Sequence, residues 1–560
     1  MNNKEIAHQF SLLSKLMEIH GENNFKATSY SVAAYKIGQL TVDLQTLSEK
    51  NIANIPGIGE ATGTKIIEII STGKLKMLED LISKTPDGIL EMLKIKGIGP
   101  KKISLIWKEM GIENVGELLY ACNENRLSLY KGFGKKTQQN VIESIEFYLR
   151  QQGSFLFAQV ELLVHDLKNI LQKIFVCEQI NITGDFRRQA ETVDMLEFAI
   201  PLSEKIILEK LEASEEFKFV EKQDAFILYK YNNSIKIKLL FTDRENLLQK
   251  TFISTGSDKF IAAFEDHFPN LNFTQLKSET EIFEQAGIQF IPAFMRESAS
   301  IISVASENKI PKVIQPEDIK GIIHCHSNWS DGINTLPQLA DACIKNGKEY
   351  LVISDHSKAA SYAQGLSEER IKEQHKLVDE LNEKLYPFKI FKSIESDILN
   401  DGNLDYSNSV LSTFDLVIAS VHSNLKMNQD KAMMRLINAI ENPYTTILGH
   451  MTGRLLLSRK GFPVDHKKII DACAANNVVI EINAHPRRLD MRWQWIEYAL
   501  SRNVLLSIDP DAHSIPEFEN TRYGVLVAQK GMVTTRNNLS SFTLNEFEKF
   551  LRDRKQTKKM

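Results

Sequence analysis

Cysteine is scarce and scattered in this sequence. Its 560 residues include five cysteines, and no two of them form a CxxC pair. An odd, dispersed set of thiols is typical of a reducing compartment, and it argues against a disulfide framework or a zinc site built from thiolates. We therefore expect a cytoplasmic protein in which any metal ion is bound by other side chains.

Long apolar runs and a charge imbalance are also missing. No stretch approaches 18 uncharged apolar residues, so we expect no membrane-spanning helix. The N-terminal residues predict an amphipathic helix rather than a signal peptide, because charged side chains interrupt them throughout. The formal net charge is only −4, so binding to a polyanion would have to use local basic surface or backbone amides.

The chain is too long for a single hydrophobic core and predicts several domains. The first 150 residues are expected to be all helical, and strand-like runs such as 195–200 then indicate an α+β unit. The polar, proline-containing stretch 306–320 predicts a linker, and the basic tail RDRKQTKKM is expected to be disordered. The predicted segments are 1–88, 89–150, 151–248, 249–305, 306–320 and 321–560.

Seven apolar runs alternate with helix-like segments after residue 320. They are KGIIHCH, YLVISDH, FKIFKSIESD, LVIASVH, TTILGH, VVIEINAH and VLLSIDPDAH. This alternation is typical of a parallel βα barrel, in which the carboxyl ends of all strands converge on one face. Side chains that end these runs should therefore meet there, although they lie far apart in the sequence.

Six of the seven runs end in residues that can bind a metal ion. The remaining run, VVIEINAH, ends at His485, which is a weaker candidate. A single histidine at a strand end is more often a hydrogen-bonding residue, but six such ends are hard to explain by packing. Imidazole and carboxylate without thiolate suit Zn²⁺, Mn²⁺ or Fe²⁺, and so many ligands suit two or three ions. The candidate ligands are His324, His326, Asp331, His356, Glu395, His422, His450, Asp511 and His513.

Three glycine hairpins, IPGIGEATG, IKGIGPKK and YKGFGKK, punctuate the helical region. Paired glycines let the backbone approach a DNA phosphate, which amides at the following helix N-terminus can bind without reading sequence. One such hairpin could be a simple turn between helices, but three copies favour DNA binding. The candidate contacts are Gly57, Gly59, Gly97, Gly99, Lys101, Lys102, Gly132, Gly134, Lys135 and Lys136.

Residues 321–553 resemble the PHP (polymerase and histidinol phosphatase) family through HCHSNWSDG, ISDHS, IESDILNDGNLDY, ASVHS, NPYTTILGHMTGR, EINAHPRRLD and DPDAHS. The resemblance implies a distorted (βα)7 barrel that hydrolyses phosphoesters and binds three ions. One ion would take His324, His326, Glu395 and Asp511, a second Glu395, His422 and His450, and a third Asp331, His356 and His513. The expected catalytic residues are Glu395, Asp511, His326 and Arg454. Arg454 and Lys358 are candidate phosphate contacts, although either could instead be a solvated side chain.

Residues 1–300 resemble the family X DNA polymerases, whose bacterial type carries a C-terminal PHP domain. The matching motifs are IPGIGEATGTKI, TGKLKMLEDL, IKGIGPKK, GDFRRQAETVDMLEF, FISTGSDKF and TEIFEQAGIQFIPAFMRE. The resemblance implies a helix-hairpin-helix lyase-like domain and fingers, a nucleotidyltransferase-like palm, and a thumb. It also places Lys65 at the position of a lyase nucleophile, near Lys26 and Tyr30. The alternative, that Lys65 is a helix residue facing solvent or phosphate, is the one we favour.

The palm departs from the family's metal-binding pattern. Nucleotidyl transfer needs Mg²⁺ ions held by carboxylates on neighbouring strands. The family's three aspartate positions fall here at Met195, Glu197 and Lys238, and Asp185 replaces the family's serine beside the triphosphate. A lysine at an ion position exchanges a negative charge for a positive one. We therefore predict no Mg²⁺ at the palm and an inactive polymerase module that still holds DNA.

Together these features predict a DNA-repair phosphodiesterase, acting as a 3′–5′ exonuclease through the PHP barrel with two to three Mn²⁺, Zn²⁺ or Fe²⁺ ions. We expect it to bind gapped, nicked or 3′-ended DNA through the phosphates, as a monomer near the bacterial nucleoid, with no membrane partner. Three alternatives stay open: a bifunctional polymerase and exonuclease, a small-molecule phosphatase, and a DNA-binding scaffold with structural ions. The sequence does not distinguish exonuclease from abasic-site endonuclease action.

Overall fold

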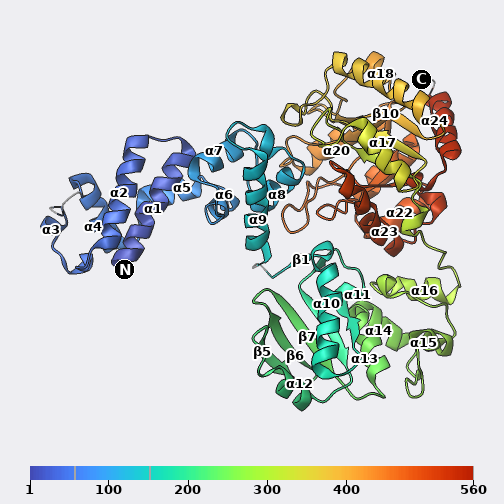
Figure 1. Ribbon diagram of the computed structural model, residues 1–560, viewed down its shortest axis with the longest axis horizontal. Helices are drawn as coiled ribbons and strands as arrows, with labels where there is room; N and C mark the ends of the chain where they lie inside the picture. The colour runs from blue at the N-terminus through green and yellow to red at the C-terminus, as the bar shows by residue number, and fades with distance from the viewer. Residues whose placement is uncertain (54, 56–57, 151–152, 559–560) are drawn as a thin grey trace. The chain divides into compact units, whose positions relative to one another are not determined.

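The structure is a computed structural model that describes residues 1–53, 55, 58–150 and 153–558. The chain forms two compact units (Figure 1). One contains residues 1–122 and 130–148, and the other contains residues 123–129 and 149–560. The short segment 123–129 therefore packs with the second unit, although helices of the first unit flank it in the sequence.

The helical region is confirmed up to residue 150. Its α-helices are α1 (Asn3–His20), α2 (Asn24–Gln39), α3 (Glu49–Ala53), α4 (Glu60–Thr72), α5 (Lys76–Ser83), α6 (Asp87–Met92), α7 (Pro100–Lys108), α8 (Val115–Asn123) and α9 (Lys135–Arg150). Helix α1 begins with a capping box, in which Asn2 accepts from the Glu5 amide and the Glu5 carboxylate accepts from the Asn2 amide. It ends at Gly21, which adopts the left-handed conformation that a helix C-terminus favours.

A five-stranded sheet forms the core of the palm, in the order β2-β4-β7-β6-β5. The strands are β2 (Asn181–Thr183), β4 (Met195–Ile200), β5 (Phe217–Gln223), β6 (Phe226–Tyr231) and β7 (Ile235–Phe241). Strands β4 and β7 are parallel, and the other pairs are antiparallel. The apolar face of α10 (Phe157–Phe175) and α12 (Glu204–Leu211) packs on this sheet in one hydrophobic cluster.

The thumb is a small helical cluster with an aromatic core. Its helices are α13 (Leu247–Thr255), α14 (Asp258–His267), α15 (Glu279–Ala286) and α16 (Ser300–Ser306). Phe252 and Phe283 contact each other and flank the fully buried guanidinium of Arg296 at 5.0 and 5.1 Å. That charge is paired with Glu279 by two hydrogen bonds, as a buried arginine requires.

Seven parallel strands form the barrel, as the seven apolar runs predict. They are β8 (Gly321–Cys325), β9 (Tyr350–Ile353), β10 (Lys389–Asp397), β11 (Leu416–Ser420), β12 (Thr445–Leu448), β13 (Val479–Asn483) and β14 (Leu506–Asp509), each paired with the next. The Ala512 carbonyl, just beyond β14, accepts from the His326 amide at 2.8 Å, and the Ala512 amide donates to the His324 carbonyl. These two bonds bring the first and last strands together, so their ends face one site.

Helices cover the outside of the barrel. They are α17 (Leu336–Lys345), α18 (Glu368–Leu385), α19 (Asn408–Leu411), α20 (Gln429–Glu441), α21 (His466–Asn476), α22 (Ile496–Ser501), α23 (Thr521–Lys530) and α24 (Leu544–Lys558). The expectation of a disordered tail is wrong up to Lys558. Helix α24 buries Phe547 and Leu551, and Arg554 donates to the carbonyl oxygens of Thr445 and Asn477.

The predicted linker also lies against the barrel. Ile314 is fully buried, and its amide donates to the Val533 carbonyl at 2.9 Å. The polar segment therefore joins the thumb and the barrel through a fixed contact. Among the described residues, no helix is both long and apolar enough to cross a membrane.

Candidate metal centre and DNA-binding elements

The ends of the barrel strands carry unusual backbone conformations. His324 has φ +58° and Asp511 has φ +52°, the left-handed region that residues with a Cβ rarely adopt. The pairing of β8 with β9 also shifts register between Ile322 and Cys325. Simple alternation along a strand therefore does not account for the direction of His324. Backbone strain of this kind clusters at functional sites, where the surrounding structure maintains it.

The first group joins His324, His326 and Asp511. Nε2 of His324 lies 3.4 Å from Oδ1 of Asp511, and Nε2 of His326 lies 3.2 Å from the same oxygen. Glu395 adjoins this group, since its Oε1 lies 3.3 Å from Nε2 of His324. These are the four residues predicted to share one ion.

The second and third groups share the same centre. Oε1 of Glu395 lies 3.0 Å from Nε2 of His450 and 3.1 Å from Nε2 of His422. Asp331 lies 3.4 Å from the Nε2 atoms of both His356 and His513, through different carboxylate oxygens. The structure thus brings together all nine predicted residues. They are His324, His326, Asp331, His356, Glu395, His422, His450, Asp511 and His513.

The donor atoms of this cluster fit divalent ions. Four overlapping groups of three or four residues each offer ligand atoms within 4.8 Å of one another. Several of these buried atoms have no hydrogen-bond partner in the protein, among them Nε2 of His324, both ring nitrogens of His326, and Oε2 of Glu395. A buried polar atom without a partner is costly, and a metal ion would use its lone pair. Imidazole and carboxylate donors together suit Zn²⁺, Mn²⁺ or Fe²⁺.

Charge within the cluster shifts the pKa of its members in opposite directions. Burial alone would lower the pKa of His422 and His513, but carboxylates beside them raise each to about 9. For His326, burial and two neighbouring histidines lower the pKa to about 3. Burial would raise the pKa of Glu395 and Asp511, yet the surrounding histidines hold both well below the usual range. The carboxylates are therefore ionised and available as ligands.

A second layer of carboxylates orients the histidines. Glu481 on β13 accepts from Nδ1 of His324 and from the backbone amide of His450. Oδ1 of Asp397 lies 3.0 Å from Nδ1 of His422. Such partners fix the tautomer and direction of a ligand histidine. Neither carboxylate was predicted from the sequence, although a single acidic residue inside the apolar run VVIEINAH was a usable signal for Glu481.

Arg454, predicted to be catalytic and a phosphate contact, is paired with a carboxylate of the protein. Its two terminal nitrogens donate to the Glu191 carboxylate at 2.8 and 3.1 Å, and the side chain is 2% exposed. Arg454 instead joins the barrel to the palm through a buried ion pair, so we do not propose a catalytic role for it.

Lys358 lies over the Tyr406 ring at 5.1 Å and near Glu368. His485 is buried, belongs to none of the four groups found among the described residues, and accepts from the Arg487 amide.

The glycine hairpins lie where helices begin. Gly59 is the N-cap of α4 and Gly99 is the N-cap of α7, while Gly97 and Gly132 adopt left-handed conformations with φ +88° and +96°. A Cβ at these positions, or at Gly134, would meet nothing within 4 Å, so the backbone is open to an approaching phosphate. Gly57 lies outside the described residues. The lysines of these hairpins are exposed or half-buried; they are Lys101, Lys102, Lys135 and Lys136.

Lys65 lies on α4, half-buried, with its Nζ 6.0 Å from the centre of the Tyr30 ring. Lys26 is exposed on α2, one turn before Tyr30. The structure thus places the three residues on facing helices of the first unit, and a lyase role for Lys65 stays a prediction.

The palm has an internal ion pair at the position where the family resemblance predicts the polymerase metal site. Glu197 and Lys238 are directly paired across β4 and β7, and Nζ of Lys238 lies 3.0 Å from Oε2 of Glu197. Met195, two residues earlier on β4, offers no oxygen ligand. Asp194 accepts a hydrogen bond from Ser154 at 2.6 Å, and Asp185 is paired with Arg188. The acidic residues near this site are therefore paired with neighbouring side chains.

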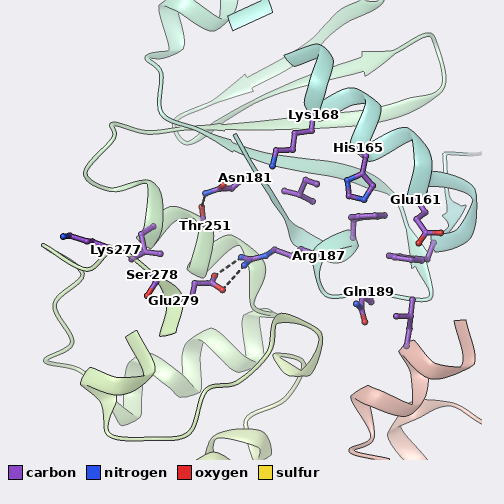
Figure 2. A pocket seen from close by; sticks show the side chains of 15 residues that line it. Glu161, His165, Lys168, Asn181, Arg187, Gln189, Thr251, Lys277, Ser278 and Glu279 are labelled. Atoms are coloured by element: carbon purple, nitrogen blue, oxygen red, sulfur yellow. Dashed lines mark hydrogen bonds and ion pairs between the residues drawn. The ribbon is translucent and has the colours of Figure 1, made fainter. Parts of the chain in front are cut away.

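A recess of about 650 Å³ lies elsewhere on the palm and thumb (Figure 2). Arg187 from the GDFRR motif reaches across it and forms a bidentate ion pair with Glu279 at 2.8 Å, drawn as dashed lines in Figure 2. Neither Glu197 nor Lys238 lines this recess. This arginine of the motif thus connects palm and thumb.

Known proteins match both parts of this structure. Residues 1–75 match a family described as a helix-hairpin-helix domain, and residues 89–146 match one described as a SAM-like helix-hairpin-helix tandem. A "Probable phosphatase" from Thermoanaerobacter sp. (strain X514) is 29% identical over 165 residues, which are 29% of this chain and 62% of that protein. Another, from Caldanaerobacter subterraneus subsp. tengcongensis, is 31% identical over 18% of this chain and 39% of that protein.

One relative matches along almost the whole chain. It is the DNA polymerase/3′-5′ exonuclease PolX of Bacillus subtilis (strain 168), which is 31% identical over 99% of this chain and 100% of that protein. The hairpins, the palm and the seven-stranded barrel agree with the family that the sequence motifs indicate. The chain therefore belongs to the bacterial family X DNA polymerases that carry a C-terminal PHP domain.

Proposed function

We propose that this chain is a metal-dependent DNA phosphodiesterase of DNA repair, which acts as a 3′–5′ exonuclease through its barrel. The observation that carries the proposal is the convergence of nine histidine and carboxylate side chains at the barrel's strand ends. The ligand set supports catalysis over a purely structural role. Three of the four groups offer three residues each, which leaves a coordination position open for water or substrate, whereas a structural zinc site is closed by four protein ligands. The Bacillus subtilis relative is named as a 3′-5′ exonuclease, which agrees with this choice.

The nine residues would hold the ions at three adjoining sites. Glu395 contacts histidines of all three groups and would be the shared ligand. Asp511 and His326 would complete the first ion site, and Asp331, His356 and His513 would form the third. Glu481 would hold His324 in one tautomer, so that its Nε2 keeps a free lone pair. When bound, the ions would stabilise the negative charge that develops on the phosphodiester, and they would lower the pKa of a bound water molecule to near neutral pH.

We infer that the palm does not transfer nucleotides. The Lys238 ammonium occupies the neighbourhood in which an Mg²⁺ ion would lie and neutralises the Glu197 carboxylate. Two unit charges at this separation attract each other by roughly 5 to 6 kcal/mol at an effective dielectric constant of 20, before screening by solvent reduces the value. A Mg²⁺ ion would have to displace this partner and would find no carboxylate at Met195. The palm would then serve to hold DNA for the barrel.

DNA would reach the barrel through phosphate contacts made by the helical unit. The open backbone at Gly59, Gly97, Gly99, Gly132 and Gly134 supports binding that is independent of base sequence. The substrate would be gapped, nicked or 3′-ended DNA, and the protein would act as a monomer in the cytoplasm. Mn²⁺ is the ion we would use in vitro, with Zn²⁺ and Fe²⁺ as alternatives, and two to three ions would bind.

Two other functions have specific support. A polymerase and exonuclease would agree with the printed name of the Bacillus subtilis relative, and the Lys238–Glu197 pair argues against it. A small-molecule phosphatase would agree with the two shorter relatives. The two helix-hairpin-helix matches argue against that function, because a metabolite enzyme has no use for DNA-binding hairpins.

A single gel assay separates these functions. A 5′-labelled primer on a gapped template is incubated with Mn²⁺, with and without dNTPs, using the wild-type protein and His324→Ala. We expect a ladder of shorter products that dNTPs do not change and that His324→Ala abolishes. Primer extension that persists in His324→Ala and is lost in Glu197→Ala would refute the inactive palm. Hydrolysis of histidinol phosphate by a protein that leaves the DNA undegraded would refute the nuclease function.

A further inference from the structure

A segment that follows α8 in the sequence lies against the metal centre. Residues 123–129 belong to the same compact unit as the barrel. Nε of Arg126 lies 3.7 Å from Oδ2 of Asp331, one of the nine candidate ligands. The Asn125 side-chain amide is 3.4 Å from the Asp331 backbone carbonyl. No motif in the sequence singles out this segment, since its nearest recognisable feature is the third hairpin, YKGFGKK.

Arg126 is held in place from two sides. Its Nη2 lies 2.7 Å from Oε2 of Glu124, a side chain that is 4% exposed. Its guanidinium carbon lies 4.5 Å from the centre of the Tyr362 ring, within cation–π distance. Such contacts fix a long side chain and reduce the entropy that it would lose on binding a ligand.

A second arginine approaches the same edge of the centre. Nε of Arg488 lies 3.7 Å from Oδ2 of Asp511, and its Nη2 lies 4.0 Å from Oε1 of Glu124. Glu124 therefore has a guanidinium near each of its carboxylate oxygens. Both arginines are largely buried, with side chains 17% and 5% exposed.

The charge at this edge depends on the ions. Asp331 and Asp511 each lie 3.7 Å from one of the arginines, but as ligands they would give their charge to the ions. Two guanidinium groups beside Glu124 then present positive charge next to the ion site, which favours an anion. The guanidinium group is planar and matches a phosphate through paired hydrogen bonds.

We propose that Arg126 is a phosphate-binding residue of the nuclease site, which contacts a DNA phosphate next to the bond that is cleaved. Glu124 and Tyr362 position it, and the chain from Arg126 leads within a few residues into the third DNA-binding hairpin. The substrate that this arrangement favours is a DNA strand, since a small phosphate ester has no second phosphate to offer. The inference rests on the proposed exonuclease function and assigns it a residue from outside the barrel.

The test compares Arg126→Ala and Arg126→Lys with the wild type. Arg502→Ala is the matched control, because Arg502 is half-exposed on the barrel and paired with Asp471. Removal of the 3′ nucleotide from a 5′-labelled single strand is measured with Mn²⁺ over a range of salt concentrations, and bound manganese is counted by elemental analysis.

We expect Arg126→Ala to lower kcat/KM about 100-fold with manganese content unchanged, in the range of a lost transition-state donor. Arg126→Lys should recover only part of the loss, because one ammonium cannot bind in a bidentate way. The slope of log kcat/KM against log salt should become shallower by about 0.7, the value for one phosphate contact on a single strand. Arg502→Ala should match the wild type in all three measurements.

Three results would overturn the inference. An unchanged kcat/KM in Arg126→Ala would show that no substrate phosphate depends on this residue. Loss of manganese or of folded protein in both variants would make Arg126 a structural anchor. A lowered kcat/KM with an unchanged salt slope would mean that the arginine acts without contacting phosphate. A wild-type protein that degrades no DNA, by contrast, would refute the proposed function itself.

Discussion

Replacing Glu395 by glutamine should remove the ligand on which the metal centre depends most. The carboxylate is 1% exposed, and its two oxygens lie between 2.9 and 3.3 Å from nitrogens of His324, His356, His422 and His450. Glutamine has the same shape, so the substitution changes charge and leaves the volume of the side chain almost unaltered. No other candidate ligand reaches as many members of the cluster.

The size of the effect follows from the distances. A unit charge about 4 Å from another contributes about 4 kcal/mol at an effective dielectric constant of 20, which corresponds to roughly a 1000-fold change in affinity. A divalent ion doubles this attraction. The amide oxygen of glutamine remains a weak ligand, however, so part of the binding free energy is kept. We therefore expect manganese affinity to fall about 1000-fold at the two sites that share Glu395.

The measurement is the number of bound manganese ions at a series of free concentrations, with exonuclease rate recorded in parallel. Glu395→Gln should keep at most one tightly bound ion, from the Asp331 group, and should lose at least 1000-fold in rate. Asp471→Asn, which changes an exposed carboxylate on α21, is the control. Glu395→Gln with the wild-type number of ions and the wild-type rate would refute the shared-ligand argument.

Three further outcomes follow from the same contacts. Glu481→Gln should weaken manganese binding about 10- to 100-fold with no loss of folded protein, because the histidine it orients loses a charged acceptor; titration with manganese checks this, and unchanged affinity would contradict it. Arg454→Met should lower the free energy of unfolding by about 3 kcal/mol in urea denaturation, because Glu191 loses its buried partner, and a further Glu191→Met should recover part of that loss. The metal-free protein should lose stability as pH rises from 6.5 to about 9, since His422 and His513 have raised folded-state pKa values and their contribution is complete only below 6.5. Melting temperatures with and without chelator measure this window, and a chelated protein that becomes more stable with rising pH would contradict the assignment.

The barrel and its ligands could be predicted because each signal is local. An apolar run followed by a histidine or an acidic residue indicates both a strand and its chemistry, and parallel topology alone then brings the strand ends together. All seven strands and the convergence of the nine side chains were accessible in this way. The direction of the His324 side chain was not, because its left-handed backbone conformation leaves no signal in the sequence.

The errors concern partners that lie far apart in the sequence. Arg454 follows a barrel strand and suggests a phosphate contact, but its partner Glu191 precedes it by 263 positions. Arg554 lies in a strongly basic tail that reads as disordered, yet it finds two buried carbonyl oxygens on the barrel. Composition cannot reveal either pairing. For the same reason Arg126 gave no signal, since its importance depends on Asp331, which is 205 residues further along the chain.

The palm and the barrel respond to charge in opposite ways, as the proposed function of a nuclease with an inactive palm requires. In the palm, Lys238 neutralises Glu197 directly, so the site is stable without an ion and gains little by binding one. In the barrel, buried donors of His324, His326 and Glu395 have no hydrogen-bond partner in the protein, so this site is incomplete without ions. Removal of divalent metal should therefore destabilise the barrel and leave the palm unaffected. Lys238→Met would remove the positive charge that neutralises the half-buried Glu197 carboxylate. It would not restore Mg²⁺ binding, because Met195 still supplies no oxygen ligand.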